Sequence, residues 1–190
     1  AYTQWLCFRQ WLDLRSHADR RGVKLMGDLP IGVSFHSADV FFNRSIFHTN
    51  WFGGTPPEGY SAENPFIHEW GQNWGVPLYN WEAMVETRFA WWRERLKRLT
   101  GIFGMFRIDH ILGFYRIYAF PWHPRRNHEF LGLAHHEAEQ LAEGRLPRWF
   151  CHPDDTDEHK AINRANGDSR LRAILEAAGE AEVIAEDLGW

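Results

Sequence analysis

Hydrophobic and polar positions repeat in one order three times along the chain: an amphipathic helix, a glycine, a short apolar strand and a carboxylate. Apolar side chains recur every three or four positions in the predicted helices, residues 5–12, 81–99 and about 168–178. Short apolar runs follow as predicted strands, residues 23–26, 104–108 and 182–185. These strands lead in turn to Asp28, Asp109 and Glu186. Strands that alternate with helices predict an α/β fold with a parallel sheet.

Residues with capping preferences set the limits of the predicted helices. Asn80 suits the N-cap of the second helix, and Asp168 or Ser169 suits that of the third. Glycines suit the three C-terminal ends, at Gly22, Gly101 and Gly179.

Carboxylates at three strand ends favour a (β/α)₈ TIM barrel over a doubly wound sheet. A barrel builds its active site from the C-terminal ends of several strands. A doubly wound sheet usually carries a glycine-rich phosphate loop, and this sequence has none. A whole barrel needs about 250 residues, whereas the chain has 190. We expect a partial barrel: residues 1–190 as a fragment of one catalytic barrel domain, with loop insertions at about 32–79 and 121–167.

The second strand places an arginine and an aspartate on one face. Side chains alternate along a strand, so Arg107 and Asp109 point the same way, and Phe106 and Ile108 point toward the helices. We expect the arginine to keep Asp109 ionised by lowering its pKa, which suits a nucleophile. A purely structural ion pair is the alternative.

The other two strand-end acids fit a related role. Glu186 lies beside Asp187, so we expect its pKa to be raised, as in a general acid. An acid placed only at a helix N-terminus is the alternative. One carboxyl group with a lowered pKa and one with a raised pKa, at neighbouring strand ends, fit glycoside chemistry through a covalent intermediate. Asp28 is expected either to bind sugar hydroxyls or only to cap a turn.

Composition narrows the class of partner. The chain has 21 Lys+Arg and 25 Asp+Glu, a net charge of −4, which argues against nucleic-acid and anionic-membrane partners. We find no transmembrane segment or signal peptide in the sequence. The 11 Trp, 14 Phe and 5 Tyr indicate a heavy core or a groove that stacks sugar rings. The distant Cys7 and Cys151 are expected to be reduced thiols of a cytoplasmic protein.

The aromatic loop at residues 51–81 and the histidines do not point to one specific chemistry. Residues 51–81 mix aromatic and amide side chains, which serve equally as plugs of a packed loop or as a sugar site. The 11 histidines lack the spacings of zinc sites, so we expect no metal.

Motifs in a fixed order carry a family resemblance. They are Gly27-Asp28-Leu29-Pro30-Ile31, Ser37-Ala38-Asp39-Val40, Gly54-Thr55-Pro56-Pro57, Gly71-Gln72-Asn73-Trp74-Gly75, Phe106-Arg107-Ile108-Asp109-His110-Ile111-Leu112-Gly113-Phe114 and Ala185-Glu186-Asp187-Leu188-Gly189. With them the sequence resembles 4-α-glucanotransferases of the amylomaltase, or disproportionating enzyme, type, glycoside hydrolase family 77 of the α-amylase clan.

The resemblance implies a retaining transferase that needs no cofactor and acts on malto-oligosaccharides and starch- or glycogen-type α-glucans. Asp109 would be the nucleophile, and Glu186 the general acid and base. Arg107 would position Asp109, while Asp28 and His110 would hold sugar hydroxyls. The loop that covers bound glucan would contain Tyr60, Gln72 and Trp74.

The family's third catalytic acid is expected downstream of Trp190. Two alternatives therefore stay beside the transferase: a hydrolase of the same clan, and an inactive glucan-binding fragment. We expect the isolated chain to be inactive and aggregation-prone, because an unclosed parallel sheet exposes its edges.

Overall fold

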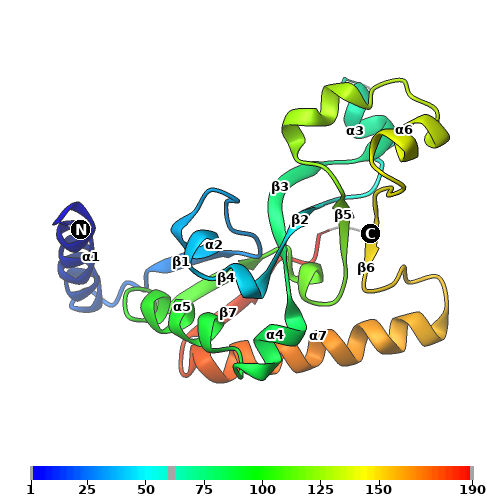
Figure 1. The fold of residues 1–190 in the computed structure, drawn as a ribbon. Coiled ribbons are helices and arrows are strands. Elements are labelled where there is room, and N and C mark those ends of the chain that lie inside the picture. The colour runs from blue at the N-terminus through cyan, green and yellow to red at the C-terminus, as the bar shows by residue number, and fades with distance from the viewer. Residues whose placement is uncertain (1, 60–62, 189–190) are drawn as a thin grey trace.

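The computed structural model describes residues 2–59 and 63–188, and these form two sheets (Figure 1). The parallel sheet has the order β1-β4-β7, with strands β1 (Met26–Pro30), β4 (Met105–Asp109) and β7 (Glu182–Ala185). The antiparallel sheet has the order β3-β2-β5-β6, with strands β2 (Phe47–Gly54), β3 (Asn73–Tyr79), β5 (Ile117–Phe120) and β6 (Arg148–Phe150). The predicted α/β fold with a parallel sheet is confirmed.

The three predicted repeats supply neighbouring strands of the parallel sheet. Asp28 pairs with Arg107 between β1 and β4, and Ile108 pairs with Ala185 between β4 and β7. The first strand starts at Met26 instead of ending there, so Asp28 lies inside the strand and not after it. Parallel register therefore brings the three acidic ends to one edge of the sheet.

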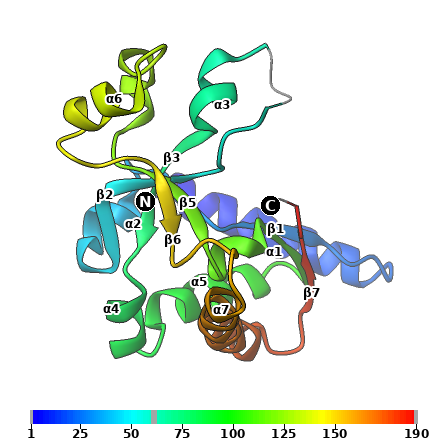
Figure 2. The same ribbon diagram turned by 90° about the vertical axis from the view of Figure 1, so that its right-hand side faces the viewer.

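The opposite face of this sheet packs against helices. Phe106 and Ile108 of β4 are 0% and 1% exposed, as the predicted alternation requires. Helices α5 (Ala90–Thr100) and α7 (Asp157–Ala178) lie side by side in the lower part of the molecule (Figures 1 and 2). They contribute the fully buried Leu96 and Ile174 to the same core.

The helix predicted for residues 81–99 is two helices, so that prediction is wrong. α4 (Trp81–Glu86) ends before Arg88 and Phe89, whose φ angles are 51° and 56°, and α5 begins at Ala90. The break between the two helices buries Phe89 in the main core, whereas Val85, on the predicted apolar stripe, is 57% exposed. Burial of one aromatic ring outweighs continuous helix at this point.

The prediction starts the third helix too late in the sequence, at Asp168 or Ser169. α7 starts at Asp157, and the hydroxyl of its N-cap Thr156 accepts the amide hydrogen of His159 at 3.1 Å. Gly167 lies inside the helix because the Tyr115 ring occupies the space where a side chain would stand: a Cβ there would lie 2.0 Å from it. Close approach of these two residues fixes α7 against the segment that follows β4.

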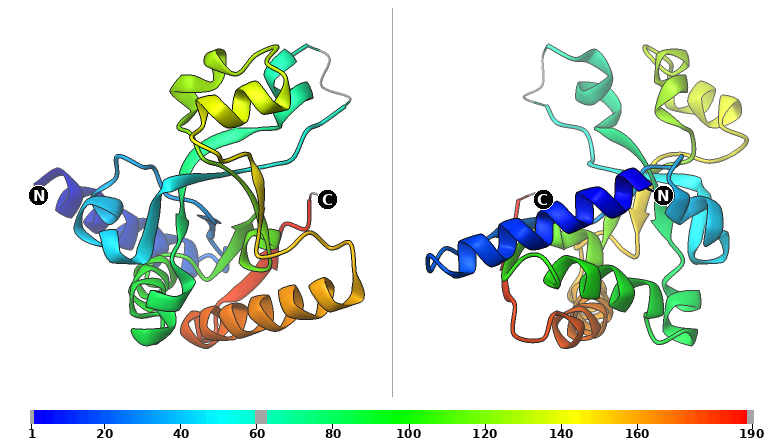
Figure 3. Two further views of the ribbon diagram at one scale, coloured as in Figure 1. Left: turned by 45° about the vertical axis from the view of Figure 1, so that its right-hand side comes forward. Right: turned by 90° about the vertical axis from the view of Figure 1, so that its left-hand side faces the viewer.

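The first predicted helix forms but packs little. α1 (Tyr2–Asp19) has one buried residue, Ala18, while Trp5 and Phe8 are 54% and 44% exposed. It lies at the periphery, away from α3 and α6 (Figure 3). Its contacts include a hydrogen bond of 2.8 Å from Arg15 to the carbonyl of Ile102. No helix in the described ranges is long and apolar enough to cross a membrane.

The stretches expected as loop insertions contain β2, β3 and β6 of the antiparallel sheet and several short helices, while β5 lies just before the second stretch. The helices are α2 (Ala38–Phe42), η1 (Arg44–Ile46), α3 (Pro65–Trp70), η3 (Pro124–Glu129) and α6 (His135–Leu141). A separate aromatic cluster joins α3 to the segment that contains η3 and α6. Trp70 lies beside Trp122, and the ring of Trp122 is stacked on that of Phe130 with centroids 3.6 Å apart. Much of the aromatic excess therefore builds cores.

Alanine at Gly167 should destabilise the protein. Alanine normally gains about 1 kcal/mol over glycine inside a helix. Here its Cβ would overlap the Tyr115 ring, and overpacking of this kind costs about 1–3 kcal/mol. We expect a lower melting temperature for Gly167→Ala in the protein as its gene encodes it.

The companion variant Tyr115→Ala tests the cause. The double variant should recover part of the loss, as a double-mutant cycle would show. A Gly167→Ala protein more stable than the parent would contradict the close contact.

Candidate active site

One guanidinium joins three carboxylates at the C-terminal edge of the parallel sheet. Arg107 Nε donates to Asp28 Oδ1 at 2.7 Å, and Nη2 donates to Asp109 Oδ1 at 2.7 Å. Nη1 reaches Glu186 Oε1 at 3.4 Å. Strand register explains the meeting, because Asp28 lies opposite Arg107 in β1 and Glu186 directly follows β7. The candidate residues from all three repeats are therefore brought together.

The turn after β4 fixes Glu186. The Glu186 amide extends the sheet by donating to the carbonyl of Ile108 at 2.9 Å. His110 adopts a left-handed conformation with φ 55°, and its backbone N–H donates to Glu186 Oε2 at 2.9 Å. η2 (Ile111–Phe114) follows, and the Ile111 amide donates to the Glu186 carbonyl. His110 thus serves this site through its backbone as well as its ring.

The two carboxyl groups have pKa shifts opposite to those predicted from the sequence. Burial, with the neighbouring Glu186, raises the pKa of Asp109 in spite of Arg107. The backbone N–H of His110 lowers the pKa of Glu186. The prediction failed because it paired Arg107 with Asp109 alone, whereas three acids share this arginine and a backbone donor serves Glu186.

An open cleft of about 560 Å³ lies over these groups. Asp109, His110 and Glu186 line its floor, and Gln72 and Trp74 line its wall. The Trp74 ring stands edge-on to the His110 ring, with centroids 4.9 Å apart. Burial lowers the pKa of His110, which favours a neutral imidazole. A flat apolar ring beside hydrogen-bonding groups is the composition that a sugar site needs.

Hydrogen bonds hold the wall of the cleft in one arrangement. Trp74 Nε1 donates to Gln72 Oε1 at 3.1 Å, and Gln72 Nε2 donates to Glu58 Oε1 at 2.8 Å. Thr55 Oγ1 donates to the same Glu58 oxygen at 3.0 Å. The amide nitrogen and the amide oxygen of Gln72 are therefore both hydrogen-bonded, and Trp74 is held beside His110.

Sequence reasoning missed Glu58, and it placed Tyr60 where the structure gives no description. Glu58 is separated from Gln72 by 14 positions, and no helical or strand spacing links them. Its place directly after the Gly-Thr-Pro-Pro motif was the available signal. Tyr60 lies outside the described residues.

Other candidates from the aromatic and histidine-rich segments lie elsewhere. Phe66, Trp70 and Tyr79 are buried in cores, and Trp74 alone of the aromatic residues described here lines the cleft. Within residues 2–59 and 63–188, no group of three or more His, Cys, Asp or Glu side chains could hold a metal ion. Both cysteines are free thiols.

Comparisons with known proteins agree with one another. Residues 1–190 match the 4-alpha-glucanotransferase family, glycoside hydrolase family 77. A chloroplastic/amyloplastic 4-alpha-glucanotransferase of Solanum tuberosum is 38% identical over 192 residues, covering 98% of this chain and 27% of that protein. The Thermus thermophilus 4-alpha-glucanotransferase is 33% identical over 195 residues, covering 100% of this chain and 32% of that protein.

A solved structure extends the likeness to the fold. Amylomaltase from Streptococcus agalactiae in complex with acarbose superimposes with a TM-score of 0.70 at 25% identity, covering 100% of this chain and 32% of that one. The chain thus spans about a third or less of the length of these relatives. The resemblance seen in the motifs is confirmed.

Asparagine at Asp109 should stabilise the fold at neutral pH. Because the folded state raises the pKa of Asp109, its ionised form is disfavoured relative to the unfolded chain. The gain should be full above the folded-state pKa and vanish below the ordinary value of 3.8, where both states bind the proton. Melting temperatures of Asp109→Asn and the parent, across this pH range, measure the effect.

Asp155 supplies a matched control. A hydrogen bond with His159 lowers the pKa of Asp155, so Asp155→Asn should not raise the melting temperature at neutral pH. If Asp109→Asn melts below the parent at neutral pH, the direction given for Asp109 is wrong.

Proposed function

The chain belongs to the 4-alpha-glucanotransferase family, and from this premise we propose that it carries the nucleophile and the acid/base residue of a retaining 4-α-glucanotransferase. One observation carries the proposal: Asp109 and Glu186 stand at neighbouring strand ends, are joined by Arg107, and both line one open cleft. Two carboxyl groups of separate function are what glycoside transfer by double displacement needs.

We also propose that the parallel sheet is an arc of a (β/α)₈ barrel, within one catalytic domain. Three consecutive strand–helix repeats pair in chain order, as barrel strands do. The antiparallel sheet stands as an insertion over the strand ends, where barrel enzymes place their binding loops (Figure 1). The likeness to an amylomaltase structure supports this arrangement.

In the first step Asp109 forms the covalent intermediate. Its carboxylate oxygen attacks the anomeric carbon, and the glycosidic C–O bond breaks. The departing oxygen takes the proton of Glu186. Positive charge grows on the sugar ring in the transition state, and three carboxylates around one guanidinium leave excess negative charge to stabilise it.

In the second step the glycosyl group moves to an acceptor sugar. The 4-hydroxyl oxygen of the acceptor attacks the anomeric carbon, and its proton passes to the Glu186 carboxylate. The bond to Asp109 then breaks, and both carboxyl groups regain their starting protonation. Configuration is retained because two inversions occur.

Substrate binding must oppose the pKa shifts of the free site. In the free site Asp109 is the carboxyl group with the raised pKa, and that of Glu186 is lowered. A glucan in the cleft excludes water from Glu186, which raises the pKa of an acid. The cationic character of the reacting sugar favours ionised Asp109 by direct attraction. The bound ligand thus shifts the pKa of each carboxyl group in the direction that its role as acid or nucleophile needs.

Residues around the pair suit the recognition of α-1,4-glucans. Asp28 is 56% exposed at its side chain and free to accept a sugar hydroxyl, although it also binds Arg107. His110 and Trp74 offer a polar edge beside an apolar face, and Gln72 stands next to them. Malto-oligosaccharides and starch- or glycogen-type glucans are the proposed substrates. The related amylomaltase structure is a complex with acarbose, which supports a sugar ligand for this chain.

We also propose a cytoplasmic setting without nucleic-acid or membrane partners. Free thiols at Cys7 and Cys151 agree with a reducing, cytoplasmic setting. The potato relative is named as a chloroplastic/amyloplastic protein. Absence of nucleic-acid and membrane partners follows from the acidic charge balance.

A hydrolase of the same clan would use the same two carboxyl groups, with water as the acceptor. Incubation with maltotriose separates the reactions: a transferase forms longer oligomers and glucose, whereas a hydrolase forms only shorter sugars. Production of shorter sugars alone would replace the proposal.

Asp109→Asn should abolish transfer. Loss of a nucleophile removes several kcal/mol of transition-state stabilisation, about four decades in rate. Transfer on maltotriose by the protein as its gene encodes it measures the loss. Circular dichroism shows whether the variant is folded. More than about a tenth of the parent rate would rule out Asp109 as the nucleophile.

Glu186→Gln should affect substrates unequally. A general acid is needed only when the leaving oxygen must gain a proton. The variant should therefore lose maltotriose activity and keep the first step on maltosyl fluoride, seen as a burst of fluoride. Glu58→Gln, outside the proton-transfer path, should treat both substrates alike. Equal losses of both reactions in Glu186→Gln would refute the assignment.

A further inference from the structure

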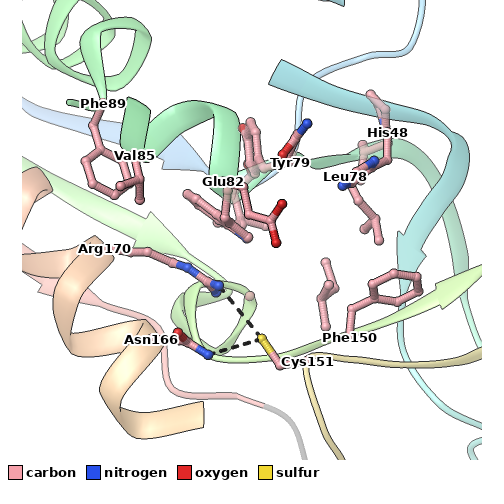
Figure 4. A pocket seen from close by; sticks show the side chains of 18 of the residues that line it. His48, Leu78, Tyr79, Glu82, Val85, Phe89, Phe150, Cys151, Asn166 and Arg170 are labelled. Atoms are coloured by element: carbon pink, nitrogen blue, oxygen red, sulfur yellow. Dashed lines mark hydrogen bonds between the residues drawn. The ribbon is translucent and has the colours of Figure 1, made fainter. Parts of the chain in front are cut away.

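A second cavity of about 460 Å³ lies beside the catalytic cleft and contains none of its carboxylates. β3, α4 and α7 supply most of its lining (Figure 4). Ile31, Gly32 and Val76 line both cavities and form the wall between them. Its volume is in the range of sites for small molecules.

A buried arginine points into this cavity. Arg170 of α7 is 8% exposed, and Figure 4 shows its guanidinium directed at the interior. Nη1 donates to the carbonyl of Phe114 at 2.5 Å, and Nη2 lies 3.8 Å from Cys151 Sγ. The guanidinium also stacks over the Trp81 ring at 4.5 Å. No carboxylate of the described residues is among the groups that act on its charge.

This environment gives Arg170 no ion-pair partner among the described residues. Burial lowers the pKa of the group, which reflects the cost of holding a cation away from water. A guanidinium has five N–H donors, and the two contacts above occupy one each, one of them with a weak sulfur acceptor. A buried cation with donors to spare is stabilised by an anion that enters the cavity.

The remaining lining is divided into a polar and an apolar side. Asn166 lies on the same face of α7 as Arg170, since it precedes it by four residues, and Ser169 also lines the cavity. Leu78, Val85 and Phe150 stand on the other sides of the cavity (Figure 4). An apolar body therefore has a place opposite an anionic head.

We propose that this pocket binds a small organic carboxylate whose apolar ring or chain rests on Leu78, Val85 and Phe150 while its head binds Arg170. One guanidinium matches one negative charge. A doubly charged phosphate suits the pocket less, because the carboxylate of Glu82 also faces it (Figure 4). The site is independent of the proposed transfer reaction, since none of the groups placed in that reaction lines it.

Benzoate and benzamide, which have the same ring and differ in charge, test the proposal by isothermal titration calorimetry on the protein as its gene encodes it. Benzoate should bind, and the affinity of benzamide should be at least about tenfold lower, which is the loss expected when a charge-assisted contact is removed. Equal affinities, or no heat from benzoate, would overturn the proposal.

Two sets of variants locate the binding. Arg170→Met should weaken benzoate at least about tenfold. Val85 is 57% exposed, so it can be changed without opening the core. Val85→Trp should fill the cavity and abolish binding, whereas Val85→Ala should retain it. If Arg170→Met does not fold, the Val85 pair still decides: unchanged benzoate affinity in Val85→Trp would show that the ligand lies elsewhere.

Discussion

The guanidinium of Arg107 is the interaction on which the site depends. Asp28, Asp109 and Glu186 come from three strands, and like charges at one sheet edge would repel without a shared cation. Arg107 reaches all three because it lies at the centre of the parallel sheet, on the face away from the core. This single contact ties the fold to the chemistry: parallel pairing supplies the carboxylates, and the arginine sets their spacing.

Packing behind the sheet supports that edge. The turn after β4 carries His110, whose backbone N–H binds Glu186, and it continues into η2. Arg170 of α7 holds the η2 carbonyl of Phe114, and Gly167 receives the Tyr115 ring. One helix therefore fixes the position of the turn, and the turn fixes the acid. A change in α7 reaches Glu186 through direct contacts.

The expected pKa pattern shows how a local rule can fail. From the sequence, Arg107 and Asp109 are two residues apart on one face, and their attraction predicts a lowered pKa for Asp109. In the fold the arginine is shared, and burial together with Glu186 has the larger effect on Asp109. The backbone donor that lowers the pKa of Glu186 has no sequence signature, because it arises from the left-handed turn at His110.

The repeats, the alternation in β4 and the acids at the strand ends can be read from the sequence, because periods of two and three to four residues are local properties of the chain. The family can be read from the order of its motifs. Where helices break, as at Phe89, and how far α7 extends depend on tertiary packing, since burial of individual rings outweighs propensity. The Glu58–Gln72 contact and the buried charge of Arg170 were likewise decided by segments distant in sequence, whose approach depends on packing that no local pattern records.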